Sequence, residues 1–195
     1  MSPLRARAEG IVAEDAPASS VGYARRMTVA GKVTIRRATR ADRSTLLELH
    51  RALYVTHRDR IVPEERLPLI AYRNFDAVLR EDVDSMLANP DVVFLVAEVG
   101  GAIVGYVTGH VENDARRVLP KKGVIEDWYV EESTRGLGVG KTLLATAEDI
   151  FRRVGCLVIE SATWPTNEGA RRAHEALGFQ EIQIVYRKRI DSTGA

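Results

Sequence analysis

Residues 130–142 read Val130-Glu-Glu-Ser-Thr-Arg-Gly-Leu-Gly-Val-Gly-Lys-Thr142, and they form a glycine-rich turn between two regular segments. Residues 124–130 form the predicted strand that enters the turn, and residues 139–154 carry apolar side chains at helical spacing. Glycines at such a junction let backbone N–H groups approach a ligand closely, and the N-terminus of the helix adds partial positive charge. The turn therefore suits a diphosphate group, to which Arg135 and Lys141 would add positive charge.

Two common phosphate-binding motifs do not fit this spacing. A P-loop needs a glycine five residues before the one that precedes Lys-Thr, but that position is Arg135. The dinucleotide fingerprint needs a glycine three residues after its second glycine, but the residue three after Gly138 is Lys141. The pattern that remains is Arg-x-x-Gly-x-Gly, at Arg135, Gly138 and Gly140.

A second motif follows about thirty residues later, over residues 167–179. Asn167 opens a predicted helix, the small residue Ala170 stands three positions later, and the helix runs into Leu-Gly-Phe at its end. Gly178 is typical of a helix C-terminus that leads into the next element. A plain helix-capping role for Asn167 is the alternative reading.

Together the two motifs resemble those of the GCN5-related N-acetyltransferase (GNAT) family, and the resemblance covers residues 33–190. It implies a single-domain mixed α/β fold, with a central, mostly antiparallel mixed sheet flanked by helices, and it implies acetyl-CoA as co-substrate. Contacts to acetyl-CoA would come from the strand backbone, the glycine-rich turn and the Asn side chain. These positions are Trp128, Tyr129, Val130, Arg135, Gly136, Gly138, Val139, Gly140, Lys141 and Asn167.

Acetyl transfer to an amine also requires a group that accepts the amine proton, because a lysine-like amine has a pKa of ~10.4. The strand before the turn offers Glu126 and Asp127. Strict alternation would send them to opposite faces, with Glu126 on the face of Trp128 and Val130. Glu126 also matches the position where polyamine and some aminoglycoside acetyltransferases carry an acidic residue. We therefore predict Glu126 as the base or amine-orienting group and Asp127 as the second candidate; a salt-bridged or solvated carboxylate is the alternative for both.

His174 stands where many GNAT members carry a tyrosine, four residues before Gly178. An imidazole can protonate a leaving thiolate near neutral pH, so His174 is the candidate general acid; the alternative is that it only lines the cofactor channel. Cys156 is predicted to be an inert core thiol.

Composition limits the classes of protein to which the chain could belong. The chain has 195 residues, 45% hydrophobic and 28% charged, with a net charge of +1, which disfavours a dedicated nucleic-acid binder. A single cysteine and four scattered histidines exclude a disulfide framework and predict no metal site. No apolar stretch reaches the ~20 residues of a membrane helix, so no membrane partner and a cytoplasmic location are expected.

Residues 1–31 predict a disordered tail and residues 32–192 the acetyltransferase domain. In order, the domain should contain a strand, two helices, a hairpin about Gly100-Gly101, a strand, a helix, a strand, a helix and closing strands. The corresponding ranges are 33–37, a helix after Asp42, a helix ending before residue 89, 92–99, 102–110, 124–130, 139–154, 157–161, 166–177 and 179–190.

These features predict an acetyl-CoA-dependent N-acetyltransferase that acts on a primary amine, either a small cationic amine or a protein amine, by direct transfer in a ternary complex. The alternative is a non-catalytic acyl-CoA-binding or regulatory module of the same fold. A homodimer is compatible with the sequence but is not determined by it.

Overall fold

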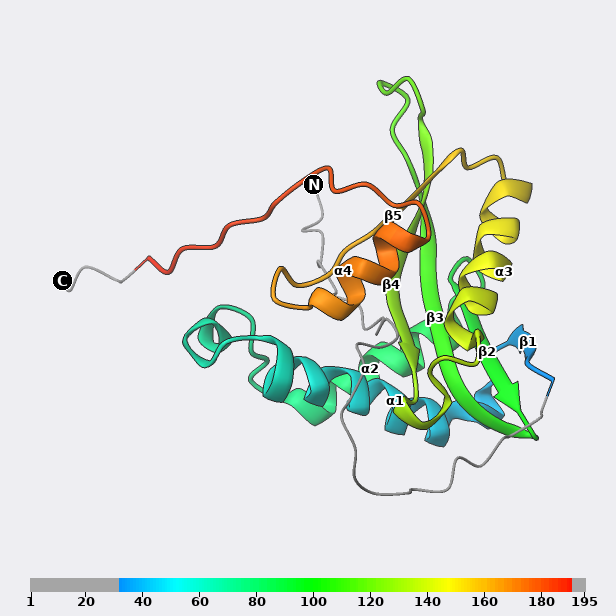
Figure 1. The fold of residues 1–195 in the computed structure, drawn as a ribbon, viewed down its shortest axis with the longest axis horizontal. Coiled ribbons are helices and arrows are strands. Elements are labelled where there is room, and N and C mark those ends of the chain that lie inside the picture. The colour runs from blue at the N-terminus through cyan, green and yellow to red at the C-terminus, as the bar shows by residue number, and fades with distance from the viewer. Residues whose placement is uncertain (1–31, 191–195) are drawn as a thin grey trace, which may run out of the picture.

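The structure is a computed structural model that describes residues 32–190 (Figure 1). The predicted tail, residues 1–31, lies outside the described residues, as do the last two residues of the predicted domain. The elements are β1 (Thr34–Arg37), α1 (Arg43–Thr56), α2 (Phe75–Ala88), β2 (Val93–Val99), β3 (Ala102–Asn113), β4 (Lys121–Val130), α3 (Val139–Arg153), β5 (Val158–Ser161) and α4 (Glu168–Ala176), with short helical turns between some of them.

The sheet has five strands in the order β1-β2-β3-β4-β5. The first four are antiparallel neighbours, and β4 pairs with β5 in parallel, so the predicted mixed sheet is confirmed. The predicted hairpin joins β2 to β3 through Gly100 and Gly101, whose φ angles of 60° and 84° lie in the left-handed region that the tight turn requires.

Helices cover both faces of the sheet (Figure 1). On one face α3 packs against β2, β3 and β4, in a core that contains Trp128, Leu143 and the fully buried Phe151. On the other face α1 and α2 bury Leu46 and Val83 against Tyr106 and their neighbours. The helices therefore bury apolar stripes that the sequence spacing predicts.

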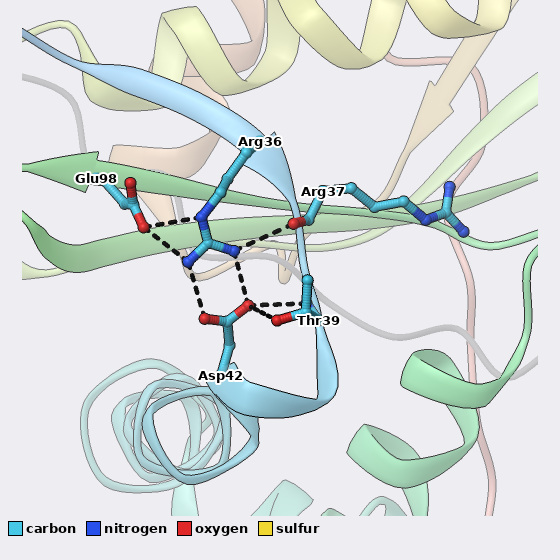
Figure 2. Close-up of polar contacts among 5 residues, drawn as sticks. All are labelled: Arg36, Arg37, Thr39, Asp42 and Glu98. Atoms are coloured by element: carbon cyan, nitrogen blue, oxygen red, sulfur yellow. Dashed lines mark hydrogen bonds and ion pairs between the residues drawn. The ribbon is translucent and has the colours of Figure 1, made fainter.

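A polar cluster at the start of the domain ties β1, β2 and α1 together (Figure 2). Arg36 donates to both carboxylate oxygens of Asp42, at 2.7 and 2.8 Å, and to Glu98 of β2 at 2.8 Å. Asp42 also accepts from the backbone N–H and hydroxyl of Thr39. Hydrogen bonding by the Arg36 guanidinium holds the pKa of Asp42 well below its usual range. Asp42 thus joins the start of α1 to β1 through its side chain.

The predicted closing strands over 179–190 are wrong. Residues 180–190 form no strand and are exposed throughout, and they extend away from β5 in Figure 1. A strand requires a neighbouring backbone edge as hydrogen-bond partner, and this segment meets none in the described part of the chain. Alternating apolar residues indicate that a segment can form a β-strand, but they do not show that another strand is available to pair with it.

No helix within residues 32–190 combines the length and the apolar character needed to cross a membrane.

Candidate functional site

The glycine-rich turn lies where β4 runs past the end of its neighbour β5. The parallel ladder between the two strands covers Lys122–Ile125 of β4, but β4 continues to Val130. Arg135 then folds back, and its Nε donates to the Val130 carbonyl at 3.0 Å. The structure therefore places the predicted turn directly against the C-terminal end of β4.

Two glycines give the turn its shape. Gly136 and Gly138 have φ angles of 79° and 76°, and Gly138 is the N-cap of the 15-residue helix α3. A Cβ at Gly138 would meet no heavy atom within 4 Å, so the surface in front of it is open. A Cβ at Gly140 would lie 3.4 Å from Nε1 of Trp128, which shows how closely α3 packs on β4. The turn can present backbone N–H groups to an anion.

The other turn residues have different environments. Val139 is 1% exposed and packs in the core, so it can contribute only backbone to a ligand. Lys141 is exposed. In the first turn of α3, Lys141 therefore places a positive charge in solvent, whereas the Val139 side chain packs in the core.

Strict alternation, which we expected to separate Glu126 from Asp127, fails in β4. The β3–β4 register shifts so that Asp127 lies opposite Thr108 but Ile125 lies opposite Gly109, which leaves Glu126 as an extra residue. Ile125 and Trp128, three residues apart, consequently pack in the same core cluster. A β-bulge inserts one residue and breaks the two-residue period, so Glu126 does not share the face of Trp128 by alternation.

Glu126 is 26% exposed and pairs with His110, whose Nδ1 lies 3.2 Å from Oε1 of Glu126. His110 precedes Val111, which packs against the α3-side core, so alternation directs His110 to the α1/α2 face. Glu112 flanks the other ring nitrogen at 3.5 Å. Hydrogen bonding to Glu126 raises the pKa of His110 above its usual value. Glu126 is thus a partly accessible carboxylate beside an imidazole.

Asp127, by contrast, is 0% exposed and belongs to a buried polar cluster between the sheet and α1. Its Oδ2 lies 3.6 Å from Nδ1 of His50, and that nitrogen lies 2.8 Å from the Tyr106 hydroxyl. The other ring nitrogen of His50 is 3.9 Å from Asp82. This environment favours a structural role for Asp127 over direct contact with an acceptor.

Sequence reasoning missed the role of His50. The signal was present, because His50 lies next to Leu49 and three residues before Leu53 on the helical stripe that the α1 spacing predicts to be buried. A polar residue on that stripe needs a polar partner on the facing sheet.

The second motif attaches α4 to β5 and β4. Asn167 is buried, and its Oδ1 accepts from the Ala170 N–H at 3.1 Å, so it caps α4. Nδ1 of His174 lies 2.7 Å from the Ala170 carbonyl, which can only accept, so Nδ1 carries the proton. In the neutral ring Nε2 then accepts from the Ser161 hydroxyl, 2.8 Å away. Ser161 is a further site residue that the sequence analysis did not single out.

His174 also makes an edge contact with the Trp128 ring, with centroids 6.2 Å apart. It therefore connects the two strands at the point where their ladder ends.

Two further expectations concern Cys156 and metals. Cys156 is buried, as predicted, and burial raises its pKa. Among residues 32–190 no group of three or more His, Cys, Asp or Glu side chains could hold a metal ion.

The sequence model of the Acetyltransferase (GNAT) family matches residues 49–179. An aminoglycoside N(6′)-acetyltransferase type 1 from Stenotrophomonas maltophilia is 30% identical over 162 residues, which cover 81% of this chain and 94% of that protein. Among solved structures, the aminoglycoside N-acetyltransferase AAC(6′)-Iy in complex with CoA superposes with a TM-score of 0.65 at 24% identity, over 83% of this chain and 97% of that one. A predicted acetyltransferase with acetyl-CoA from Clostridium acetobutylicum gives 0.63 at 19% identity, over 81% and 96%.

Proposed function

The chain belongs to the GNAT family and is an N-acetyltransferase, and from this premise we propose that it transfers the acetyl group of acetyl-CoA to a primary amine of a small, polycationic, aminoglycoside-like acceptor. The observation that carries the choice of acceptor is the match over 94% of the length of an aminoglycoside N(6′)-acetyltransferase. The partly exposed carboxylate of Glu126, at the bulge in the middle of β4, is compatible with a cationic acceptor.

The glycine-rich turn fits the diphosphate of CoA. Its positive-φ glycines, the open surface in front of Gly138 and the N-terminus of α3 are the features that a diphosphate needs. Arg135 shapes the turn through its bond to Val130, whereas the exposed Lys141 supplies the accessible positive charge. The backbone of Trp128, Tyr129 and Val130, beyond the end of the β5 ladder, is the proposed contact for the thioester and pantetheine.

We propose that Glu126 binds the acceptor amine and removes its proton. Its carboxylate would attract the ammonium group and accept a proton, directly or through water, so that the neutral amine can attack. The nitrogen lone pair then forms the C–N bond with the thioester carbonyl carbon and the C–S bond breaks. The nitrogen loses its second proton to give the amide, and the thiolate takes up one proton, directly or by relay. Because Nε2 of the neutral His174 ring is an acceptor, His174 can supply that proton only after it is itself protonated.

A matched pair of acceptors tests the proposal. Two aminoglycosides that differ only in a 6′-amino or a 6′-hydroxyl group are incubated with acetyl-CoA, and free thiol release is followed. We expect turnover with the amine alone, with one thiol released per acetyl group found on the product. Tight acetyl-CoA binding without turnover on aminoglycosides, polyamines or peptides would instead favour the non-catalytic module.

A matched pair of variants tests the residue assignment. Glu126→Gln should lower kcat/KM at least about 100-fold, a typical loss for a positioned base. Glu112→Gln is the control, because it removes the other carboxylate beside His110 and leaves Glu126 in place. Equal activity of the two variants would remove Glu126 from the mechanism.

A further inference from the structure

The β-bulge in β4 is held by a side chain of the neighbouring strand β3. The backbone N–H of Asp127, the residue directly after the extra Glu126, donates to Oγ1 of Thr108 at 3.1 Å. Thr108 is 1% exposed, so this hydrogen bond is shielded from water. A buried N–H needs an acceptor, and a bulge disturbs the regular ladder that normally provides one. The Thr108 hydroxyl therefore holds β4 at the point where its register shifts.

The residue after Thr108 lets the two strands approach closely at the bulge. A Cβ at Gly109 would collide with the Val124 carbonyl oxygen and would lie 3.1 Å from Cζ of Phe151. Any larger residue at this position would therefore push β3 away from its neighbours. The register shift itself lies between Thr108 and Gly109. Strand β3 thus supplies both an acceptor for the bulge and the space that the bulge requires.

The side chain of Asp127 is fixed as well. Its Oδ2 lies 3.6 Å from Nδ1 of His50 on α1, and that nitrogen lies 2.8 Å from the Tyr106 hydroxyl on β3. All three side chains are buried. Asp127 is therefore held through its backbone N–H by β3 and through its carboxylate by α1, which restricts the backbone directly beside Glu126.

The bulge decides which face of the sheet Glu126 occupies. Asp127 contacts α1, and Glu126 meets His110, which alternation directs to the same α1/α2 face. Two consecutive carboxylates therefore lie on one face. In a regular strand Glu126 would instead share the face of Trp128 and enter the core beneath α3, because a shift by one residue moves a side chain to the opposite face. The bulge thus keeps Glu126 out of that core and beside His110.

We propose that Thr108 is a positioning residue for acetyl transfer: its hydroxyl holds the bulge, and the bulge directs Glu126 toward the acceptor amine. The inference rests on the role of Glu126 as the base in the proposed reaction. Thr108 acts through the backbone of Asp127 and not by touching the substrate, because its hydroxyl is buried and bonded to the Asp127 N–H. Removal of this hydroxyl should therefore move the neighbouring carboxylate and leave the glycine-rich turn in place.

The titration of His110 tests the position of Glu126 without any substrate. Glu126 raises the pKa of His110, and Glu112 stays beside the ring in every variant compared. Thr108→Val keeps the shape of the side chain but cannot accept the N–H, whereas Thr108→Ser can. In NMR titrations, Thr108→Val should lower the pKa of His110 toward the value measured in Glu126→Gln, and Thr108→Ser should restore the native value. A native titration in Thr108→Val would overturn the proposal.

Kinetics with an amine acceptor separate positioning from general damage to the fold. A displacement of about 1 Å in a catalytic group can cost about 100-fold in rate, so Thr108→Val should lower kcat at least about 10-fold. The Kd for CoA should stay close to the native value, because the glycine-rich turn lies beyond the bulge. A native kcat, or a loss of CoA binding as large as the loss of kcat, would overturn the proposal.

Two further controls keep these outcomes distinct. If Thr108→Val does not fold, Thr108→Ala takes its place in both measurements, because it also lacks the hydroxyl and leaves room for the neighbouring side chains. If the native chain acetylates no amine, the proposed function fails, whereas the His110 titration still decides whether Thr108 holds Glu126 in position.

Discussion

Replacing Gly138 with alanine separates the conformational role of the glycine-rich turn from its ligand-binding role. Gly138 has a φ of 76°, and a Cβ there meets no heavy atom within 4 Å. The cost to folding is therefore backbone strain alone, about 1–2 kcal/mol for a non-glycine residue in the left-handed region. This is less than the ~5–15 kcal/mol stability of an ordinary domain, so the variant should fold.

The cost to ligand binding has a separate origin. The added methyl group projects into the open surface where the diphosphate of CoA is proposed to lie. Loss of one charge-assisted hydrogen bond costs about 1.5–3 kcal/mol, so we expect the Kd for CoA to rise about 10- to 100-fold.

Gly100→Ala is the matched control. Gly100 also has a positive φ, 60°, and an open surface, but it lies in the β2–β3 hairpin. Both variants should lose similar stability in urea titrations, while calorimetry with CoA should show weakened binding only for Gly138→Ala. Equal Kd values for both variants and the native chain would refute the placement of the diphosphate.

Three further changes test the packing and the charges. Gly123→Ala places a Cβ 2.5 Å from Cγ of Phe151, so it should destabilise the fold by about 1–3 kcal/mol in urea titrations, and Phe151→Leu should restore part of that loss. Asp42→Asn should cost about 1–2 kcal/mol at neutral pH, because its charge-assisted partner is 36% exposed. Since the folded pKa of Asp42 is depressed, this difference is present above the ordinary value of 3.8 and should shrink as the pH falls below it; a difference independent of pH would contradict the assignment. His110→Gln should reduce stability most below pH 6.5, with the deficit vanishing as the pH rises through the raised pKa that Glu126 induces; a deficit that grows with pH would contradict the pairing.

The comparison of sequence with structure is sharpest in β4. The strand itself, its burial and its position before the turn follow from its apolar pattern, and so does the helix that begins at Val139. The bulge at Glu126 could not be predicted, because it depends on how β3 and β4 register along their whole ladder. That single extra residue changes the environment of both candidate carboxylates and separates an accessible Glu126 from a buried Asp127.

Local backbone chemistry explains why several elements could be predicted before the fold was known. Glycines at positive φ, a helix stripe at the right period and an Asn at a helix start specify local backbone geometry, so the turn, α3 and α4 could all be predicted. Only tertiary structure decided which buried polar groups meet, such as His50 with Asp127, or His174 with Ser161. It also decided that residues 180–190 stay unpaired with the sheet of their own chain. These outcomes depend on contacts between segments far apart in the chain. The residue pattern of one segment does not predict which distant segment will lie beside it.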